Sequence, residues 1–116
     1  MSPLALLVYD KLKIRAPGLR PELSYTDLVE QLPSPYANLA PDSDVLASAL
    51  GELVRACRDR NLPAISAMVV RHRERVPGPG YCPVAHPDEA DDSAKAMIAS
   101  GIELTKVRVA TYPDVL

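Results

Sequence analysis

Arginine side chains are concentrated in the middle third of the sequence, where they could contact phosphate groups. Three belong to the end of an amphipathic segment and three to the charged segment that follows: Arg55, Arg58, Arg60, Arg71, Arg73 and Arg75. In extended backbone, residues two apart point to the same side, so Arg71, Arg73 and Arg75 would form one row of guanidinium groups. Guanidinium groups bind phosphate through paired, charge-assisted hydrogen bonds. We therefore expect these arginines to bind nucleic acid; a solvated charged face without a ligand is the alternative.

Residues suited to catalysis or to metal binding are few. His72 and His86 are the only histidines, and Cys57 and Cys82 are the only cysteines. A Cys82–His86 pair could support nucleophilic catalysis, but spacing alone is weak support for it. Zinc sites use closely spaced ligand pairs, and only Cys82 and His86 lie that close. We therefore expect no catalytic residues, no metal and no cofactor, and we expect two free thiols.

Residues 76–80 contain a Gly-Pro-Gly sequence that could be mistaken for a phosphate-binding loop. The Lys-Ser or Lys-Thr pair that completes a nucleotide-binding P-loop does not follow it. Pro79 also removes one of the backbone N–H donors that such a loop needs. A rigid surface turn is the better interpretation.

The composition is typical of one ordinary globular domain. The chain has 116 residues, of which 47% are hydrophobic and 24% charged, with a net charge of −2. That length suffices for one hydrophobic core and is too short for two, so residues 1–116 are expected to form a single domain. No apolar run approaches the roughly 18 to 20 residues of a membrane span. Residues 4–8 are apolar but lack a preceding basic region, so a cytoplasmic location is expected.

Capping residues and apolar periodicity predict three helices in the first half. The first begins at Pro3 with Ser2 as its cap, and a second, within residues 23–32, is capped by Ser24. The third and longest spans residues 43–60. Its apolar residues recur at alternating steps of four and three and should face the core: Leu46, Leu50, Leu53 and Cys57.

The second half is predicted to add a strand and another helix. Residues 64–70 alternate in a way that favours a strand entered through a proline. A helix is expected from residue 87 to residue 99, with Gly101 as its stop and with Ala94, Met97 and Ile98 on its buried face. Residues 102–112 are ambiguous, and we favour a strand or an extended tail.

The order of these elements resembles the winged-helix DNA-binding domain of alkyltransferase-like proteins. The likeness covers residues 23–82 and includes the sequence Ser24-Tyr25-Thr26-Asp27-Leu28, the helix containing Ala49-Leu50, and the strand that follows Leu62-Pro63. The family's Pro-Cys-His-Arg motif is absent, since Leu62-Pro63-Ala64-Ile65 stands in its place. The resemblance implies a scaffold and no alkyl transfer, with the 43–60 helix approaching a DNA groove and residues 76–80 forming the wing.

The fold class expected is therefore α+β: a small winged-helix-like domain of three to four helices with a small antiparallel sheet. The expected function is non-enzymatic nucleic-acid binding, with DNA favoured. The alternative is a protein–protein interaction module or inhibitor that docks on a larger partner, such as an acidic protein surface, through its arginines on one side and the acidic residues at 88–92 on the other. The sequence leaves the oligomeric state open.

Overall fold

Five α-helices and two short strands make up the regular structure of the described residues. The computed structural model describes residues 1–40, 43–71, 81–88 and 92–116. The α-helices are α1 Pro3–Arg15, α2 Tyr25–Glu30, α3 Asp44–Asp59, α4 Cys82–Ala85 and α5 Ser93–Val109. Two 3-10 helices, η1 Tyr36–Asn38 and η2 Ile65–Met68, and two strands, β1 Leu23–Ser24 and β2 Val69–Val70, complete the order. The described part of the chain thus has more helices than the three to four expected.

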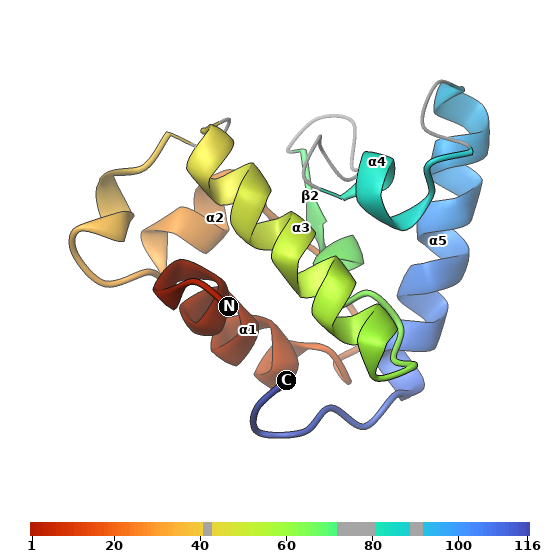
Figure 1. The fold of residues 1–116 in the computed structure, drawn as a ribbon, viewed down its shortest axis with the longest axis horizontal. Coiled ribbons are helices and arrows are strands. Elements are labelled where there is room, and N and C mark those ends of the chain that lie inside the picture. The colour runs from red at the N-terminus through yellow and green to blue at the C-terminus, as the bar shows by residue number, and fades with distance from the viewer. Residues whose placement is uncertain (41–42, 72–80, 89–91) are drawn as a thin grey trace.

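The helix α3 lies diagonally across the front of the molecule, as Figure 1 shows. α1 packs beside it, η2 and the strands lie behind it, and α5 stands along the right-hand edge. The chain after α5 returns beneath α3 to α1, where the Tyr9 hydroxyl donates to the Pro113 carbonyl and Lys13 Nζ donates to the Asp114 carbonyl at 3.0 Å. The C-terminal tail therefore closes one end of the core.

The capping residues predicted for the first two helices are confirmed, and Ser43 caps the third. The hydroxyl oxygens of Ser2, Ser24 and Ser43 accept hydrogen bonds from backbone N–H groups three residues on, at 3.2, 3.1 and 3.1 Å. Asn61 ends α3 with a φ of 56°, a left-handed conformation that asparagine tolerates better than most residues. These local signals explain why the helix starts could be read from the sequence.

The sheet differs from the expected one. β1 pairs with β2 in parallel, with Leu23 opposite Val69 and Ser24 opposite Val70. The chain passes through α2 and α3 between the two strands, and such a crossover allows a parallel pair. The expected antiparallel sheet is therefore wrong for the described residues, and the expected wing at 76–80 lies outside them.

The strand predicted at residues 64–70 is mostly a 3-10 helix. Only its last two residues form β2, because residues 65–68 form η2. All seven residues are buried. Neither side of the segment faces solvent, so the sequence shows no regular alternation of apolar and polar residues. A short apolar run of this kind cannot be distinguished from buried helix by periodicity. The Ser66 hydroxyl, which donates to the Leu50 carbonyl at 2.8 Å, ties η2 to α3.

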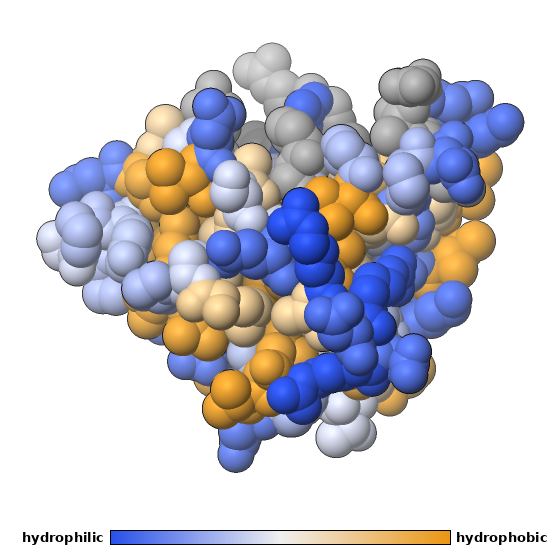
Figure 2. All heavy atoms as spheres, viewed as in Figure 1, coloured by the Kyte–Doolittle hydropathy of each residue, from blue (hydrophilic) through white to orange (hydrophobic). Residues whose placement is uncertain are grey.

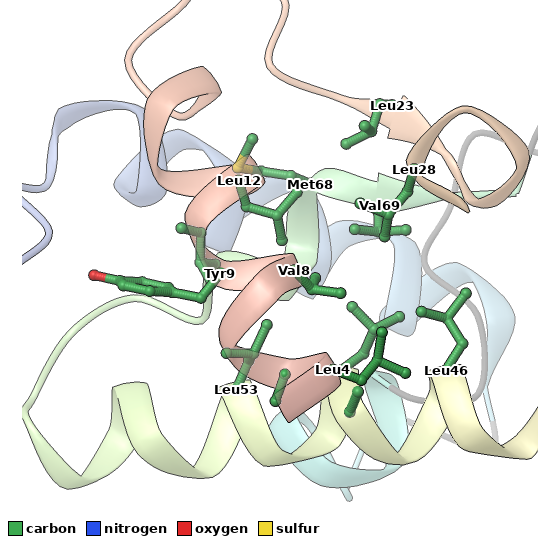
Figure 3. Close-up of a cluster of buried hydrophobic side chains, with 14 of the residues drawn as sticks. Leu4, Val8, Tyr9, Leu12, Leu23, Leu28, Leu46, Leu53, Met68 and Val69 are labelled. Carbon is green, nitrogen blue, oxygen red and sulfur yellow. The ribbon is translucent and has the colours of Figure 1, made fainter. Parts of the chain in front are cut away.

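The core is mostly aliphatic, and two fully buried tyrosines, Tyr9 and Tyr81, contribute to it. Figure 3 shows Leu4, Val8 and Leu12 of α1 between the leucines of α3 on one side and Met68 and Val69 on the other. The α3 stripe predicted from the sequence is confirmed, since all four of its members are fully buried: Leu46, Leu50, Leu53 and Cys57.

The last helix contradicts the sequence prediction in its bounds and in its orientation. It begins at Ser93, with Asp92 as its cap, and continues through Gly101 to Val109. Ala94, Met97 and Ile98, expected in the core, are exposed. The side that faces the protein instead carries Ser100, Glu103 and Val107. Of residues 102–112, which were expected to form a strand or an extended tail, only 110–112 lie beyond the helix.

Candidate functional site

Four of the six candidate arginines fall within the described residues. Arg55, Arg58 and Arg60 are exposed on and just after the last turns of α3, and Arg71 is exposed directly after β2. Arg73 and Arg75 lie outside the described residues, as does His72. Figure 2 shows strongly hydrophilic residues gathered over the C-terminal half of α3. The structure thus brings together the three arginines of the α3 end.

Acidic groups are interleaved with these arginines. Asp44 and Asp59 are exposed on the same helix, and Glu52 is half-buried one turn before Arg55. Hydrogen bonds from the Ser2 hydroxyl at 2.7 Å and the Ser2 amide at 3.2 Å lower the pKa of Glu52, which is therefore charged at neutral pH. The exposed side of α3 consequently carries both signs of charge, which weakens its attraction for a polyanion.

Arg58 makes a strong internal contact that the sequence did not predict. Its Nη1 donates to Oε2 of Glu103 at 2.7 Å, and the same oxygen accepts from the Ala64 amide at 2.6 Å. Glu103 is only 4% exposed. Burial alone would raise the pKa of Glu103, but the hydrogen bonds from Arg58 and Ala64 outweigh burial and lower it. One carboxylate therefore links α5 to α3 and to the start of η2.

The residues considered for catalysis occupy separate surroundings. Cys57 lies in the core, and burial raises the pKa of its thiol, which disfavours the reactive thiolate. Tyr81 is fully buried, and its hydroxyl lies 2.6 Å from Nε2 of the half-buried His86. Burial raises the pKa of Tyr81 well above its ordinary value, so it remains a neutral phenol. Within the described residues, no cluster of His, Cys, Asp and Glu has the arrangement of a metal site.

The outward side of α5 exposes several large aliphatic side chains. Met97 is 54% exposed, Ile98 64%, Ile102 55% and Val109 83%. At 100° per residue, these positions lie with Ala94, Gly101 and Thr105 on one side of the helix, opposite Glu103 and Val107. Figure 2 shows hydrophobic residues along the right-hand edge of the molecule, where Figure 1 places α5. We refer to Ala94, Met97, Ile98, Gly101, Ile102, Thr105 and Val109 as the outer face of α5.

Basic residues flank this outer face. Lys95, Lys106 and Arg108 are exposed, and Arg108 also donates from Nε to the Gly18 carbonyl at 3.2 Å. Glu103 is the only acidic residue of α5, and it points inward to Arg58. The solvent-facing part of α5 is therefore apolar with a positively charged border.

A hollow of about 270 Å³ adjoins this helix. Its lining combines the ion pair with the turn that follows α3: Arg58, Asn61, Leu62, Pro63, Glu103 and Lys106. The Tyr112 hydroxyl donates to the Pro63 carbonyl at 2.6 Å, so the C-terminal tail helps to fix the turn. Lys106 belongs both to the border of the outer face and to the hollow.

The sequence prediction placed three residues of the outer face, Ala94, Met97 and Ile98, in the core and assigned the rest to a helix stop and an extended segment. A helix with apolar residues on both sides gives no clear periodic signal, and Gly101 was interpreted as a stop. The signal that was available is the single acidic residue among the three basic ones of residues 93–109, because an isolated carboxylate in an apolar stretch favours an internal partner.

Comparisons with known proteins give no identity to this arrangement. In the described residues, no helix combines the length and apolar character needed to cross a bilayer. The chain matches no protein-family model, no curated protein and no solved structure.

Proposed function

We propose that this protein is a non-enzymatic interaction module that binds another protein through the outer face of α5. The observation that carries the proposal is the inverted arrangement of this helix, which buries a carboxylate and exposes three large aliphatic side chains in its middle, Met97, Ile98 and Ile102. Isolated exposed aliphatic residues are ordinary on protein surfaces, but a continuous patch of them is typical of binding sites.

The energetics favour burial of this face by a partner. Full burial of a large aliphatic side chain contributes about 1.5 to 3 kcal/mol. Each of the three central side chains has at least half of its surface still to bury. The cost of ordering a rigid helix has already been met by folding, so little conformational entropy opposes docking on this side.

The test is the loss of a protein partner from the double variant Ile98→Asp/Ile102→Asp. Purified tagged protein is incubated with nuclease-treated cell extract, and bound proteins are identified by mass spectrometry. We expect a partner that the wild type retains and the double variant loses. Val45→Asp is the matched control, because Val45 is 56% exposed on α3, where the first turn of a helix tolerates an acid. Equal recovery with all three proteins would contradict the proposal.

Nucleic-acid binding is a second proposal, favoured by the three exposed arginines at the end of α3. Arg55 and Arg58 lie one turn apart and could contact neighbouring phosphates. The winged-helix relationship remains a prediction on which this proposal draws, and the interleaved acids count against it. Binding to duplex DNA measured over a salt series tests it: about three phosphate contacts would give a slope near −3 in log K against log salt. Absence of binding at low salt would remove the proposal.

A further inference from the structure

We infer that the partner segment that occupies the outer face of α5 is an acidic amphipathic helix. This inference rests on the proposed function and specifies the chemistry of the partner. The partner would place apolar side chains at helical spacing against Met97, Ile98 and Ile102, and aspartate or glutamate side chains beside the basic border.

The positive charge of the border favours a partner with negative charge. The three charged side chains that flank the outer face are all basic: Lys95, Lys106 and Arg108. The only carboxylate of the helix is buried against Arg58 and cannot offset them at the surface. Asp92 lies at the opposite end, where its carboxylate accepts from the Ala94 and Lys95 amides. The acid-rich end of the partner therefore belongs over the C-terminal half of α5, next to Lys106 and Arg108.

The shape of the face suits a helix. Two helices pack by placing the side-chain ridges of one into the grooves of the other, so a partner helix can fit against α5 in this way. Gly101 lies in the middle of α5, and a Cβ at this position would meet no atom within 4 Å. With no side chain there, an aliphatic side chain of the partner can approach the backbone of α5 closely beside Ile98 and Ile102.

A second copy of this chain fits the face poorly. Two α5 helices packed antiparallel about Gly101 would bring Lys95 beside Lys106 of the second copy, since positions 95 and 107 are equally far from the centre. Parallel packing would place each cation beside its own equivalent. Like charges in register are unfavourable for association, whereas an acidic helix removes this repulsion.

The hollow beside α5 extends the basic border inward. Its lining includes two cationic side chains, Arg58 and Lys106, and one carboxylate, Glu103, which is paired with Arg58. Arg58 is held by Glu103 through Nη1, and its side chain remains 43% exposed. A carboxylate on the partner can therefore reach Arg58 and Lys106 from the edge of the outer face.

Two matched synthetic peptides provide the probe. Both are fluorescein-labelled, roughly 18 residues long to match the length of α5, and carry leucine at helical spacing. One has glutamate at the remaining positions and the other has lysine. At about 0.15 M salt, we expect the acidic peptide to bind at least about tenfold more tightly by fluorescence anisotropy, because several opposite-charge pairs each contribute a few tenths of a kcal/mol to 1 kcal/mol.

Variants connect this preference to the outer face. Lys95→Glu/Lys106→Glu should reverse the preference between the two peptides, and Ile98→Asp/Ile102→Asp should abolish binding of both. Val45→Asp should leave the preference unchanged. Equal or tighter binding of the lysine peptide to the wild type would overturn the inference.

Other occupants are distinguished by parallel measurements. Concentration-dependent dimerisation in analytical ultracentrifugation, lost in Ile98→Asp/Ile102→Asp, would assign the face to a second copy and overturn the inference. Flotation with anionic phosphatidylserine vesicles that excludes the acidic peptide would overturn it in favour of a membrane surface. If the extract experiment identifies a partner but the acidic peptide does not bind, the proposed function stands and this inference fails. If neither gives binding, both fail.

Discussion

The two long helices of this protein use their apolar residues in opposite ways. α3 has 16 residues and α5 has 17. α3 buries its leucine stripe against α1 and η2 and presents charges of both signs to solvent. α5 faces the protein with Ser100, Glu103 and Val107 and presents Met97, Ile98 and Ile102 outward. The buried side of α3 is therefore apolar, whereas the buried side of α5 combines the apolar Leu104 and Val107 with a paired carboxylate.

The comparison explains why an apolar surface persists on α5. Rotating α5 to bury its isoleucines would move Glu103 away from Arg58 and from the Ala64 amide. That amide would lose its acceptor in a buried region, which costs about 1 to 3 kcal/mol. The Tyr112 contact with Pro63 and the Arg108 contact with Gly18 hold the end of the helix as well. The outer face is thus a consequence of the polar contacts on the inner side.

Truncation of aliphatic side chains should give the largest difference between α3 and α5 in the free energy of unfolding. Leu53→Ala in α3 should lower the free energy of unfolding by about 3 kcal/mol, because it leaves a cavity in a fully packed site. Ile102→Ala in α5 should change it by less than about 0.5 kcal/mol, because much of that side chain contacts solvent. Urea denaturation followed by circular dichroism measures both. Similar losses in the two variants would show that the face of α5 has been misassigned.

The carboxylate of Glu103 should matter more than any exposed residue of α5. Glu103→Gln keeps the shape but removes the negative charge that pairs with Arg58, and we expect the free energy of unfolding to fall by about 2 kcal/mol. Arg55→Gln is the control, since Arg55 is exposed on α3, and it should change stability by less than about 0.5 kcal/mol. An unaffected Glu103→Gln protein would mean that the polar contacts do not orient α5.

The same carboxylate should make stability sensitive to acid. Because folding lowers the pKa of Glu103, its stabilising contribution is complete above the ordinary carboxyl pKa of 4.5 and is lost as pH falls through the lower folded value. Glu52 shifts in the same direction and adds to the effect. Urea midpoints measured from pH 7 to pH 3 should fall more steeply for the wild type than for Glu103→Gln. Parallel pH profiles would contradict this assignment.

The smallest expected effect concerns the glycine in the middle of the outer face. Gly101→Ala should raise the free energy of unfolding by about 0.5 to 1 kcal/mol, since alanine restricts the unfolded chain and its Cβ meets no atom within 4 Å. The same methyl group would occupy space that a side chain of the partner helix is proposed to approach. If Gly101→Ala raises stability but weakens binding of the acidic peptide, the glycine contributes to docking and not to folding.

The sequence predicted the parts of the fold that depend on local signals. Serine caps at Ser2, Ser24 and Ser43 mark helix starts, and the leucine stripe of α3 follows a helical period that only one face can satisfy. By contrast, the parallel pairing of β1 with β2 joins residues 46 positions apart, as Leu23 and Val69 show, and no local pattern encodes such a pairing.

The candidate site was predicted only in part. The arginines at the end of α3 were expected at the surface and are exposed, but the partner of Arg58 could not be inferred because Glu103 lies 45 residues away. Three residues of the outer face, Ala94, Met97 and Ile98, were assigned to the core because apolar residues are ordinarily buried. Tertiary contacts made by one carboxylate overrode that ordinary preference.

The most direct test of the outer face as a docking surface is photo-cross-linking from position 98. A benzophenone amino acid replaces Ile98 in one protein and Val45 in the control, two exposed aliphatic positions on different helices. Irradiation in nuclease-treated extract should give a discrete covalent protein adduct from position 98 and none from position 45. If position 98 gives no adduct, or only the same adducts as position 45, the outer face of α5 is not a docking surface.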